Sequence, residues 1–306
     1  MENKKLTGIV IRHLLDRYVV AINLDVKQEV EAKARGNIKR NNAILVGDQV
    51  EVEKNYDIYT IEKVLPRHNS LIRPPVANID TLIIVLSLAS PSPDYMLLDK
   101  ELVLCKAKQI TPIICVNKLD LLKENASLQQ EIEYLTNVYT PLCDTLIYTS
   151  TIEKEGMEQL QHHLQNRVSA FSGNSGVGKS SMITQLLGDG LKQEIEVGNV
   201  SSKTKKGKHT TKYVQLYKLA PNSYILDTPG FSSYELYDIS YKELKQYYEE
   251  FHSCHCDYED CSHVLEDVSV CDVKRQVAEN KIDKGRYERY VYLYTKLKEI
   301  EDRKYK

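Results

Sequence analysis

The sequence predicts a multidomain α/β protein with three parts in a row: a small N-terminal β-barrel, a central α/β domain and a C-terminal helical domain. Three observations support this prediction. Short alternating segments fill residues 1–72, buried apolar strands alternate with helical stretches in residues 73–235, and a group of cysteines interrupts residues 236–306. A chain of 306 residues is long enough for two or three domains with separate cores.

The composition is that of an ordinary globular protein, with 42% hydrophobic and 27% charged residues and a net charge of −2. Any nucleic-acid partner must therefore be met by local basic patches. No apolar run approaches the roughly 18 residues of a membrane span, and no signal-peptide pattern opens the chain, so we expect a cytoplasmic protein without a membrane partner. Seven cysteines in that compartment argue against disulfides, and three of them lie among apolar residues, as core residues do: Cys105, Cys115 and Cys143.

Residues 1–72 are predicted to be all-β. Four segments that are rich in β-branched residues or alternate in polarity are separated by polar turns: 8–11, 17–22, 49–53 and 59–64. Roughly five short strands in about 70 residues suit a small barrel, and the OB-fold is the leading candidate. Such barrels commonly bind oligonucleotides. Basic residues expected in the middle loop could contact phosphate or could simply solvate that loop: Lys33, Arg35, Lys39 and Arg40.

A proline-rich segment, 73–80, marks the boundary to the central domain. Beyond it, apolar runs typical of strands buried on both faces alternate with helical stretches. We expect strands near 81–89, 111–116, 145–149, 167–171, 213–217 and 224–226, and helices near 94–109, 128–138, 156–166 and 181–187. This alternation is typical of a parallel sheet covered by helices.

The run G-N-S-G-V-G-K-S, residues 173–180, is a complete phosphate-binding loop between a predicted strand and a predicted helix. Its glycines let the backbone approach an anion, and the amides at the helix N-terminus point at the phosphates. Lys179 would neutralise the β- and γ-phosphates and Ser180 would bind Mg²⁺. A chance glycine-rich turn is the alternative, and the strand–loop–helix context argues against it. The expected nucleotide contacts are Gly173, Asn174, Ser175, Gly176, Val177, Gly178, Lys179, Ser180 and Ser181.

The tetrapeptide N-K-L-D, residues 117–120, follows a buried strand at the edge where open α/β sheets bind ligands. The Asp120 carboxylate can accept hydrogen bonds from N1–H and the N2 amine of guanine, a pair of donors that adenine lacks. Asn117 can contact O6 and N7, and the Lys118 stem can pack along the base. Ser150 and Thr151, at the end of a later strand, suit the element that supports the guanine from its far side.

Two further segments are typical of nucleotide-dependent switches. The long polar segment 197–212 carries five lysines and ends in G-K-H-T-T-K, so Thr210 or Thr211 could reach Mg²⁺ and the γ-phosphate. In the D-T-P-G motif, Asp227 would hold Mg²⁺, with Ser180 and Thr211, and the Gly230 amide would sense the γ-phosphate.

The order of these motifs is unusual, because N-K-L-D and Ser150–Thr151 precede the phosphate loop, whereas in a usual GTPase they follow it. A circular permutation preserves the same sheet. It also joins the segment after Gly230 directly to the C-terminal domain, which couples that domain covalently to the nucleotide state.

The C-terminal domain is expected to begin with an amphipathic helix over 241–251 and to bind one structural Zn²⁺. The pattern Cys-x4-Cys-x-His-x7-Cys supplies three thiolates and one imidazole, which fill a tetrahedral shell. The ligands are Cys256, Cys261, His263 and Cys271, with Cys254 as an alternative.

The last predicted helix, 285–306, interleaves basic residues with tyrosines. This pattern is equally consistent with two interpretations: a helix that contacts RNA, and a solvated amphipathic helix that packs on its tyrosines.

Together these motifs resemble one family, the circularly permuted GTPases that act on the bacterial small ribosomal subunit (ribosome small subunit-dependent GTPase A). The resemblance rests on R-P-P-V-A-N-I-D, N-K-L-D, G-N-S-G-V-G-K-S, G-K-H-T-T, D-T-P-G-F and the Cys/His cluster, and it spans the whole chain. It implies an OB-fold, a permuted GTPase domain and a zinc domain, with a role in late maturation of the 30S subunit and contact with 16S rRNA. We also expect a monomer. The long last zinc spacing and Thr151 in place of Ala depart from the family pattern.

The hydrolytic residue is predicted to be His209. Many GTPases place Gln after D-x-x-G to orient the attacking water, but Phe231 stands there. His209 lies beside Thr210 and can donate or accept near neutral pH, although it could equally be a solvated loop residue. The resemblance implies the same role for it. Two other functions are alternatives: an RNA-binding scaffold that uses GTP only as a conformational ligand, and a P-loop kinase, against which N-K-L-D and D-T-P-G argue.

Overall fold

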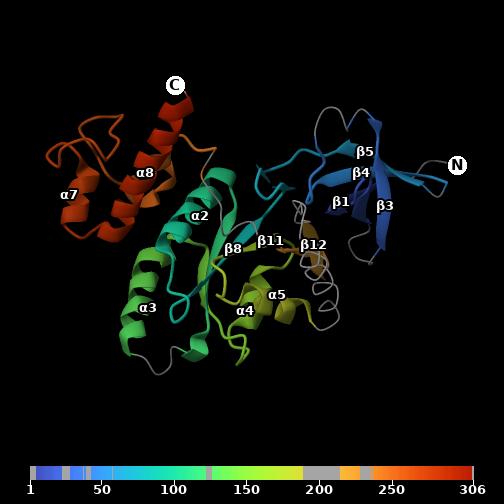
Figure 1. The fold of residues 1–306 in the computed structure, drawn as a ribbon, viewed down its shortest axis with the longest axis horizontal. Coiled ribbons are helices and arrows are strands. Elements are labelled where there is room, and N and C mark those ends of the chain that lie inside the picture. Colours follow the sequence, from blue (N-terminus) through green and yellow to red (C-terminus); the bar gives the residue numbers. More distant parts are fainter. Residues whose placement is uncertain are drawn as a thin grey trace, which may run out of the picture.

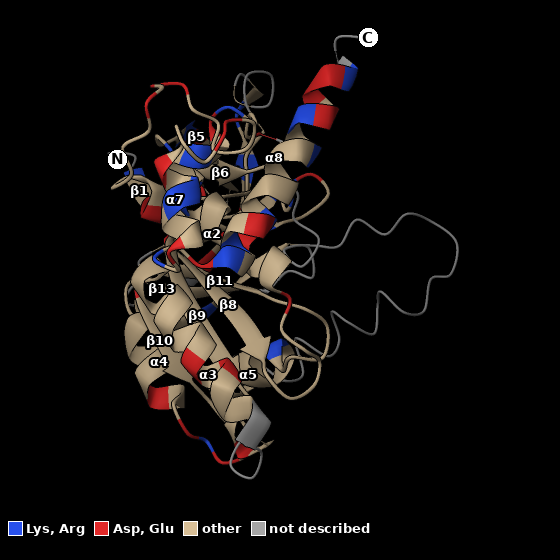
Figure 2. Cartoon of the chain, turned by 90° about the vertical axis from the view of Figure 1, so that its left-hand side faces the viewer, with Lys and Arg blue, Asp and Glu red and all other residues tan. Residues whose placement is uncertain are grey.

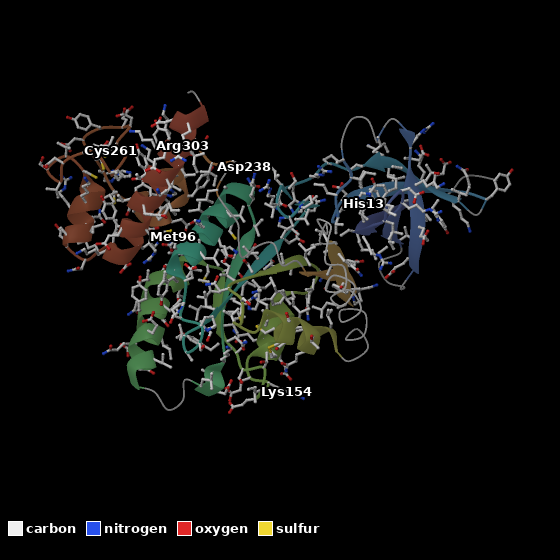
Figure 3. All side chains as sticks on the ribbon, in the orientation of Figure 1. His13, Met96, Lys154, Asp238, Cys261 and Arg303 are labelled. Atoms are coloured by element: carbon white, nitrogen blue, oxygen red, sulfur yellow. The ribbon has the colours of Figure 1, made fainter. Side chains whose placement is uncertain are left out.

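The computed structural model describes residues 5–22, 28–36, 38, 43–56, 58–121, 126–188, 214–227, 236 and 238–304. It confirms the predicted fold class, because a closed barrel, an α/β domain and a helical domain with a cysteine cluster follow one another (Figure 1). His13 on the barrel and Cys261 in the helical domain lie towards opposite ends of the molecule, with the α/β domain between them (Figure 3).

The N-terminal barrel closes through five strands: β1 (Lys5–His13), β2 (Tyr18–Ile22), β3 (Gln28–Ala34), β4 (Gln49–Asn55) and β5 (Ile58–Val64). Their order is β1-β2-β3-β5-β4, and β4 pairs back onto β1. This is the closed five-stranded arrangement expected of an OB-fold. Alternate residues point inward, so Val10, Val20 and Val52 are buried in one apolar cluster.

Strand β3 was not predicted, and Lys33 lies within it and not in a loop as expected. Only small or branched residues, such as Val30 and Ala32, mark its buried face between charged neighbours, which is a weak signal. Arg35 follows the strand directly and forms an ion pair with Glu62. Lys39 and Arg40 lie outside the described residues.

The central domain is built on a parallel sheet in the order β10-β9-β8-β11-β13, with β12 antiparallel on its edge. The strands are β8 (Thr81–Ser87), β9 (Thr111–Asn117), β10 (Thr145–Tyr148), β11 (Val168–Ser172), β12 (Gln215–Ala220) and β13 (Ser223–Asp227). Strand β12 also pairs with β1 of the barrel at Arg12 and Gln215. The barrel and the central sheet therefore form one continuous hydrogen-bonded sheet of eleven strands.

Helices cover both faces of this sheet (Figure 1). Inward residues of β8 alternate between two cores: Ile84 and Leu86 pack with α2 (Tyr95–Lys108), whereas Ile83 and Val85 pack with α4 (Met157–His163) and α5 (Lys179–Leu187). Helix α3 (Ala126–Tyr139) packs beside α2. A short β-hairpin and two 3-10 helices complete the connections: β6 (Ser70–Leu71), β7 (Val76–Ala77), η1 (Leu119–Leu121) and η2 (Thr140–Leu142).

The predicted amphipathic helix over 241–251 is wrong, because this segment forms two 3-10 helices, η5 (Leu244–Tyr247) and η6 (Glu249–Phe251). Tyr248 between them is extended, with φ −104° and ψ 95°, and its ring is fully buried. The ring packs 4.9 Å from the Tyr290 ring centroid. Burial of this aromatic ring in the domain core therefore overrides the local helical pattern.

Two α-helices complete the C-terminal domain: α7 (Asp272–Ala278) and α8 (Lys284–Lys304). Charges of both signs are mixed along α8 (Figure 2). Arg286 and Arg289 on this helix reach Asp99 of α2, and Tyr290 is fully buried. The structure therefore supports the packed interpretation of the last helix for these three residues. Within the described ranges, no helix is both long and apolar enough to cross a membrane.

Candidate nucleotide and metal sites

The phosphate-loop sequence links the end of β11 to the start of α5, as its motif requires. Gly173 and Gly178 have φ of +128° and +103°, which L side chains rarely adopt. A Cβ at Gly173 would lie 2.1 Å from the Val85 carbonyl oxygen, and one at Gly178 would lie 2.2 Å from Asn117 Nδ2. Both positions therefore require glycine for backbone conformation and for space.

The side chain of Lys179 folds back onto the start of this loop. Its ammonium donates hydrogen bonds to the Gly173 and Asn174 carbonyl oxygens, the second at 2.7 Å. The N-terminus of α5 begins at the same residue, and Ser180 follows it as an exposed residue in the first helical turn. A lysine and a helix N-terminus that face the same loop form an arrangement suited to an anion such as phosphate.

Asn117, at the end of β9, connects the N-K-L-D turn to the phosphate loop by a hydrogen bond. Its side chain is buried, and its Nδ2 donates to the Val177 carbonyl oxygen at 2.9 Å. Its Oδ1 accepts from Thr149 Oγ1 at 3.2 Å. The N-K-L-D turn and the phosphate loop, about 60 residues apart in sequence, are thus neighbours at the carboxyl edge of the sheet.

The predicted guanine-contacting residues also come together. Asp120 in η1 accepts a hydrogen bond from Ser150 Oγ at 2.6 Å, and Ser150 Oγ accepts from the Glu153 amide at 3.1 Å. Lys118 adopts φ +67°, and its ammonium donates to the Ser90 carbonyl oxygen. Thr151 follows Ser150 in the turn and is half-buried.

The remaining predicted nucleotide residues fall outside the described part of the chain. These are His209, Thr210, Thr211, Gly230 and the side chain of Asp227; the backbone of Asp227 ends β13.

Two carboxyl groups, one at the N-cap of α2 and one within α2, lie beside the phosphate loop and were not predicted. Asp94 caps α2 by accepting from the Leu97 amide at 2.9 Å, and its other oxygen accepts from Asn174 Nδ2 at 3.3 Å. Glu101 is fully buried and accepts a hydrogen bond from Ser172 Oγ, one residue before the loop. A signal for Glu101 exists in the sequence, because a carboxyl group interrupts the apolar positions of this helix.

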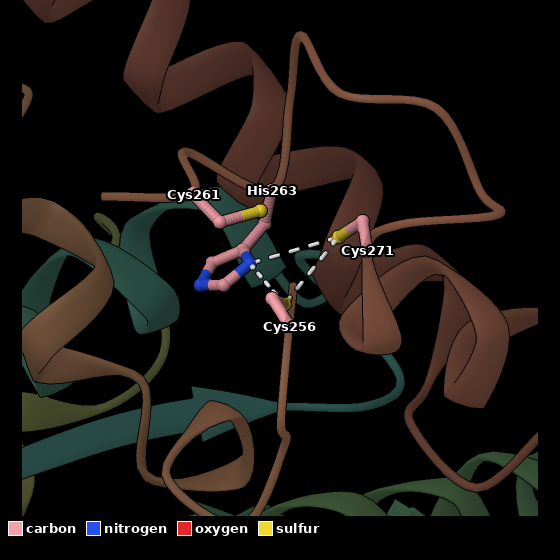
Figure 4. A group of neighbouring side chains, drawn as sticks. All are labelled: Cys256, Cys261, His263 and Cys271. Carbon is pink, nitrogen blue, oxygen red and sulfur yellow. Dashed lines mark hydrogen bonds between the residues drawn. The ribbon is translucent and has the colours of Figure 1, made fainter. Parts of the chain in front are cut away.

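The Cys/His cluster forms as predicted by its spacing (Figure 4). The ligand atoms of Cys256, Cys261, His263 and Cys271 all lie within 4.8 Å of one another. The Sγ atoms of Cys256 and Cys271 are 4.0 Å apart and lie 3.5 and 3.7 Å from His263 Nδ1. Zinc–sulfur bonds of about 2.3 Å give tetrahedral edges of about 3.8 Å, so the four groups fit a zinc ion.

Burial lowers the pKa of His263 to about 4, which keeps its imidazole in the neutral form that binds metals. Cys254, the alternative ligand, is outside this group of atoms: its Sγ donates to the Glu250 carbonyl oxygen at 3.7 Å. The group of atoms that could hold a metal ion therefore includes Cys256 and not Cys254.

Comparisons with known proteins agree with this geometry. The model of the family "RsgA GTPase" matches residues 64–237. A protein of Caldanaerobacter subterraneus subsp. tengcongensis, named small ribosomal subunit biogenesis GTPase RsgA, is 38% identical to this chain and covers 99% of both sequences. A protein of the same name from Ruminiclostridium cellulolyticum is 37% identical and covers 90% of both.

Two solved structures are similar over nearly the whole chain. The crystal structure of YjeQ from Thermotoga maritima superposes with a TM-score of 0.81 at 31% identity, and covers 96% of this chain and 99% of that one. The structure of YloQ, described as a circularly permuted GTPase, superposes with a TM-score of 0.79 at 30% identity, and covers 97% and 96%. The chain therefore belongs to the RsgA GTPase family and is a GTP hydrolase with a circularly permuted GTPase domain.

Proposed function

We propose that this GTPase acts in late maturation of the 30S ribosomal subunit, binds the subunit through 16S rRNA, and hydrolyses GTP to GDP and phosphate under stimulation by the subunit. The observation that carries the proposal is the likeness over nearly the whole chain to proteins named small ribosomal subunit biogenesis GTPase. We assign RNA binding to residues 1–72, GTP hydrolysis to 73–235 and metal binding to 236–306. The protein is expected to work as a monomer in the cytoplasm.

The nucleotide is proposed to lie along the carboxyl edge of the sheet, from Asp120 to Lys179. Asp120 would accept from guanine, and Ser150, which already donates to that carboxylate, would hold it in place. Lys179 would exchange its two loop carbonyls for the β- and γ-phosphate oxygens. The proposed contacts also include Asn117, Lys118, Thr151, Thr210, Thr211, Gly230 and the other residues of the loop 173–181.

The negative charge of the nucleotide phosphates would be offset by a bound Mg²⁺. Ser180, Asp227 and Thr211 are the residues proposed to hold it. Ser180 stands in the first turn of α5, directly after Lys179, at the position where the phosphate-loop motif places the hydroxyl that binds Mg²⁺.

The Cys/His cluster is proposed to hold one structural Zn²⁺. Three thiolates and one imidazole leave no open position for a substrate or water. The metal would therefore contribute folding free energy to the C-terminal domain and not chemistry.

The barrel is proposed to contact 16S rRNA. The turn after β4 presents Tyr56, which is 98% exposed. Lys54 is an exposed residue near the end of β4, and its ammonium lies 5.5 Å from the ring centroid of Tyr59 on β5. An exposed aromatic ring suits stacking on an unpaired base, and an exposed cation two residues away in the chain suits contact with a phosphate. In contrast, Arg286 and Arg289 are bound to Asp99 and are not offered to RNA.

His209 is proposed to orient the attacking water when the subunit orders the segment around it. Single-turnover GTP hydrolysis, measured with and without purified 30S subunits, tests both this role and the function as a whole. We expect subunits to accelerate the wild-type protein strongly, and His209→Ala to lose most of this stimulation while it keeps GTP affinity. His162→Ala, an exposed histidine on α4, serves as the matched control and should behave as wild type. Hydrolysis that does not respond to 30S subunits would contradict the proposed function.

A further inference from the structure

Helix α2 buries a carboxyl group against the sheet that carries the phosphate loop. Its buried residues include Leu97, Leu98 and Leu102, all apolar, and Glu101 stands among them with 0% exposure. An apolar side chain would be expected at such a position, because transfer of an ionised carboxylate into a protein core is costly. Glu101 therefore needs a reason beyond packing.

The surroundings of Glu101 favour its neutral form. One oxygen accepts from Ser172 Oγ, and the other is buried and has no hydrogen-bond partner among the described residues. Burial raises the pKa of Glu101 to about 8, with an added upward contribution from Asp94, while the Ser172 hydroxyl and the Lys179 ammonium act in the opposite direction. At pH 7 only about one molecule in ten would carry the charge.

We propose that Glu101 is a positioning residue of the phosphate loop, which acts as a neutral acid through Ser172, and that nucleotide binding is coupled to its protonation. Ser172 is the last residue of β11, and Gly173, whose carbonyl accepts from Lys179, is the next residue. The hydrogen bond from Ser172 thus holds α2 against the strand end from which the loop departs. This inference rests on the phosphate loop proposed above.

Within the part of the chain that the structure describes, the charged and titratable groups that face Glu101 come from α2 and α5. Asp94 is the N-cap of α2, Cys105 belongs to α2 and Lys179 belongs to α5, and β11 contributes the Ser172 hydroxyl. A bound nucleotide would add several negative charges on the far side of the loop and would engage Lys179, whose ammonium lowers the pKa of Glu101. The added negative charge makes the ionised form of Glu101 less favourable than in the free protein, so its pKa rises. Glu101 therefore takes up a proton when the nucleotide binds.

The size of the effect follows from linkage. If the nucleotide raises the pKa of Glu101 by one unit from about 8, the dissociation constant rises about threefold between pH 6.5 and pH 8.5. At pH 8 the same shift corresponds to uptake of about 0.4 proton per nucleotide bound.

Calorimetric titration with Mg²⁺ and GDP, in two buffers of different ionisation enthalpy at pH 6.5, 7.5 and 8.5, measures both quantities. Glu101→Gln keeps the shape of the neutral acid and cannot ionise. We expect it to bind GDP like wild type at pH 6.5, to bind about threefold more tightly than wild type at pH 8.5, and to lack the extra proton uptake. Because both proteins see the same ionisation of guanine and phosphate, their difference isolates Glu101. Glu288→Gln, an exposed carboxyl group on α8, should follow wild type.

Equal pH dependence and equal proton uptake in wild type and Glu101→Gln would overturn the proposal. If Glu101→Gln does not fold, Glu101→Leu, which also cannot ionise and suits the apolar neighbours on α2, takes its place, and equal proton uptake by that variant and wild type would refute the proposal. Failure of the folded wild-type chain to bind GDP at any pH would instead overturn the phosphate loop itself.

Discussion

One buried carboxylate of the central domain pairs with two arginines of the C-terminal domain, and its removal gives a quantitative prediction. Asp99 on α2 is fully buried and accepts hydrogen bonds from three groups. Oδ1 accepts from an Arg286 nitrogen and from the Tyr139 hydroxyl at 2.9 Å, and Oδ2 accepts from Arg289 Nε at 2.6 Å. Glu250 of the C-terminal domain also pairs with Arg286.

Asp99→Asn keeps the shape of the side chain but removes its charge and turns an amide donor towards a guanidinium. Removal of one partner from a buried ion pair costs about 3–5 kcal/mol. Because Arg286 retains Glu250, and Arg289 is 17% exposed, we expect the lower end of this range, about 3 kcal/mol. The loss should be concentrated at the packing of α8 on α2.

Urea unfolding followed by circular dichroism measures the overall change, and amide hydrogen exchange of α8 locates it. We expect exchange of α8 in the variant to be about a hundredfold faster than in wild type. Glu288→Gln, which breaks an exposed ion pair with Lys284 on the same helix, is the matched control and should cost less than about 1 kcal/mol. An Asp99→Asn protein as stable as this control would refute the reasoning.

Three further predictions concern the base, the metal and the buried acid. Asp120→Asn should shift nucleotide preference from guanine towards xanthine, because the amide donates where guanine also donates; equal affinity of the unmodified protein for ATP and GTP, measured by calorimetry, would contradict the assignment. Chelation or Cys261→Ser should unfold the C-terminal domain and leave nucleotide binding largely intact, and metal analysis of protein purified without chelator should find about one zinc per chain. The pKa of Glu101 is raised from 4.5 to about 8 in the folded state, so between these pH values the unfolded chain has lost the proton and the folded chain keeps it. The free energy of unfolding therefore falls as pH rises from about 4.5 to about 8. Glu101→Gln should therefore gain stability relative to wild type between pH 5 and pH 8 in urea unfolding, and a constant difference would argue against the raised pKa.

Features whose chemistry depends on local spacing could be predicted from the sequence. The phosphate loop spans 8 residues, the N-K-L-D turn 4 and the Cys/His pattern 16, so the groups of each motif are close together in the chain. The alternation of buried strands and helices likewise predicted the central sheet, and the fold class and the family are confirmed. The alternation of strands and helices can be recognised because it is repeated along the chain, and the motifs can be recognised because they rarely occur by chance.

The tertiary structure decided the features that depend on partners distant in the chain. Segment 241–251 has a helical pattern, but burial of the Tyr248 ring breaks it into two short helices. The basic residues of the last helix suited RNA contact as well as packing in the sequence. In the structure, Arg286 and Arg289 both donate hydrogen bonds to Asp99, which lies almost 190 residues earlier in the chain. The sequence marks Glu101 as a carboxyl group among apolar helix positions, but only the structure shows that Ser172 donates a hydrogen bond to it. In each case the free energy comes from desolvation and pairing of groups that only the folded chain brings together, and a linear pattern of residues contains no record of such neighbours.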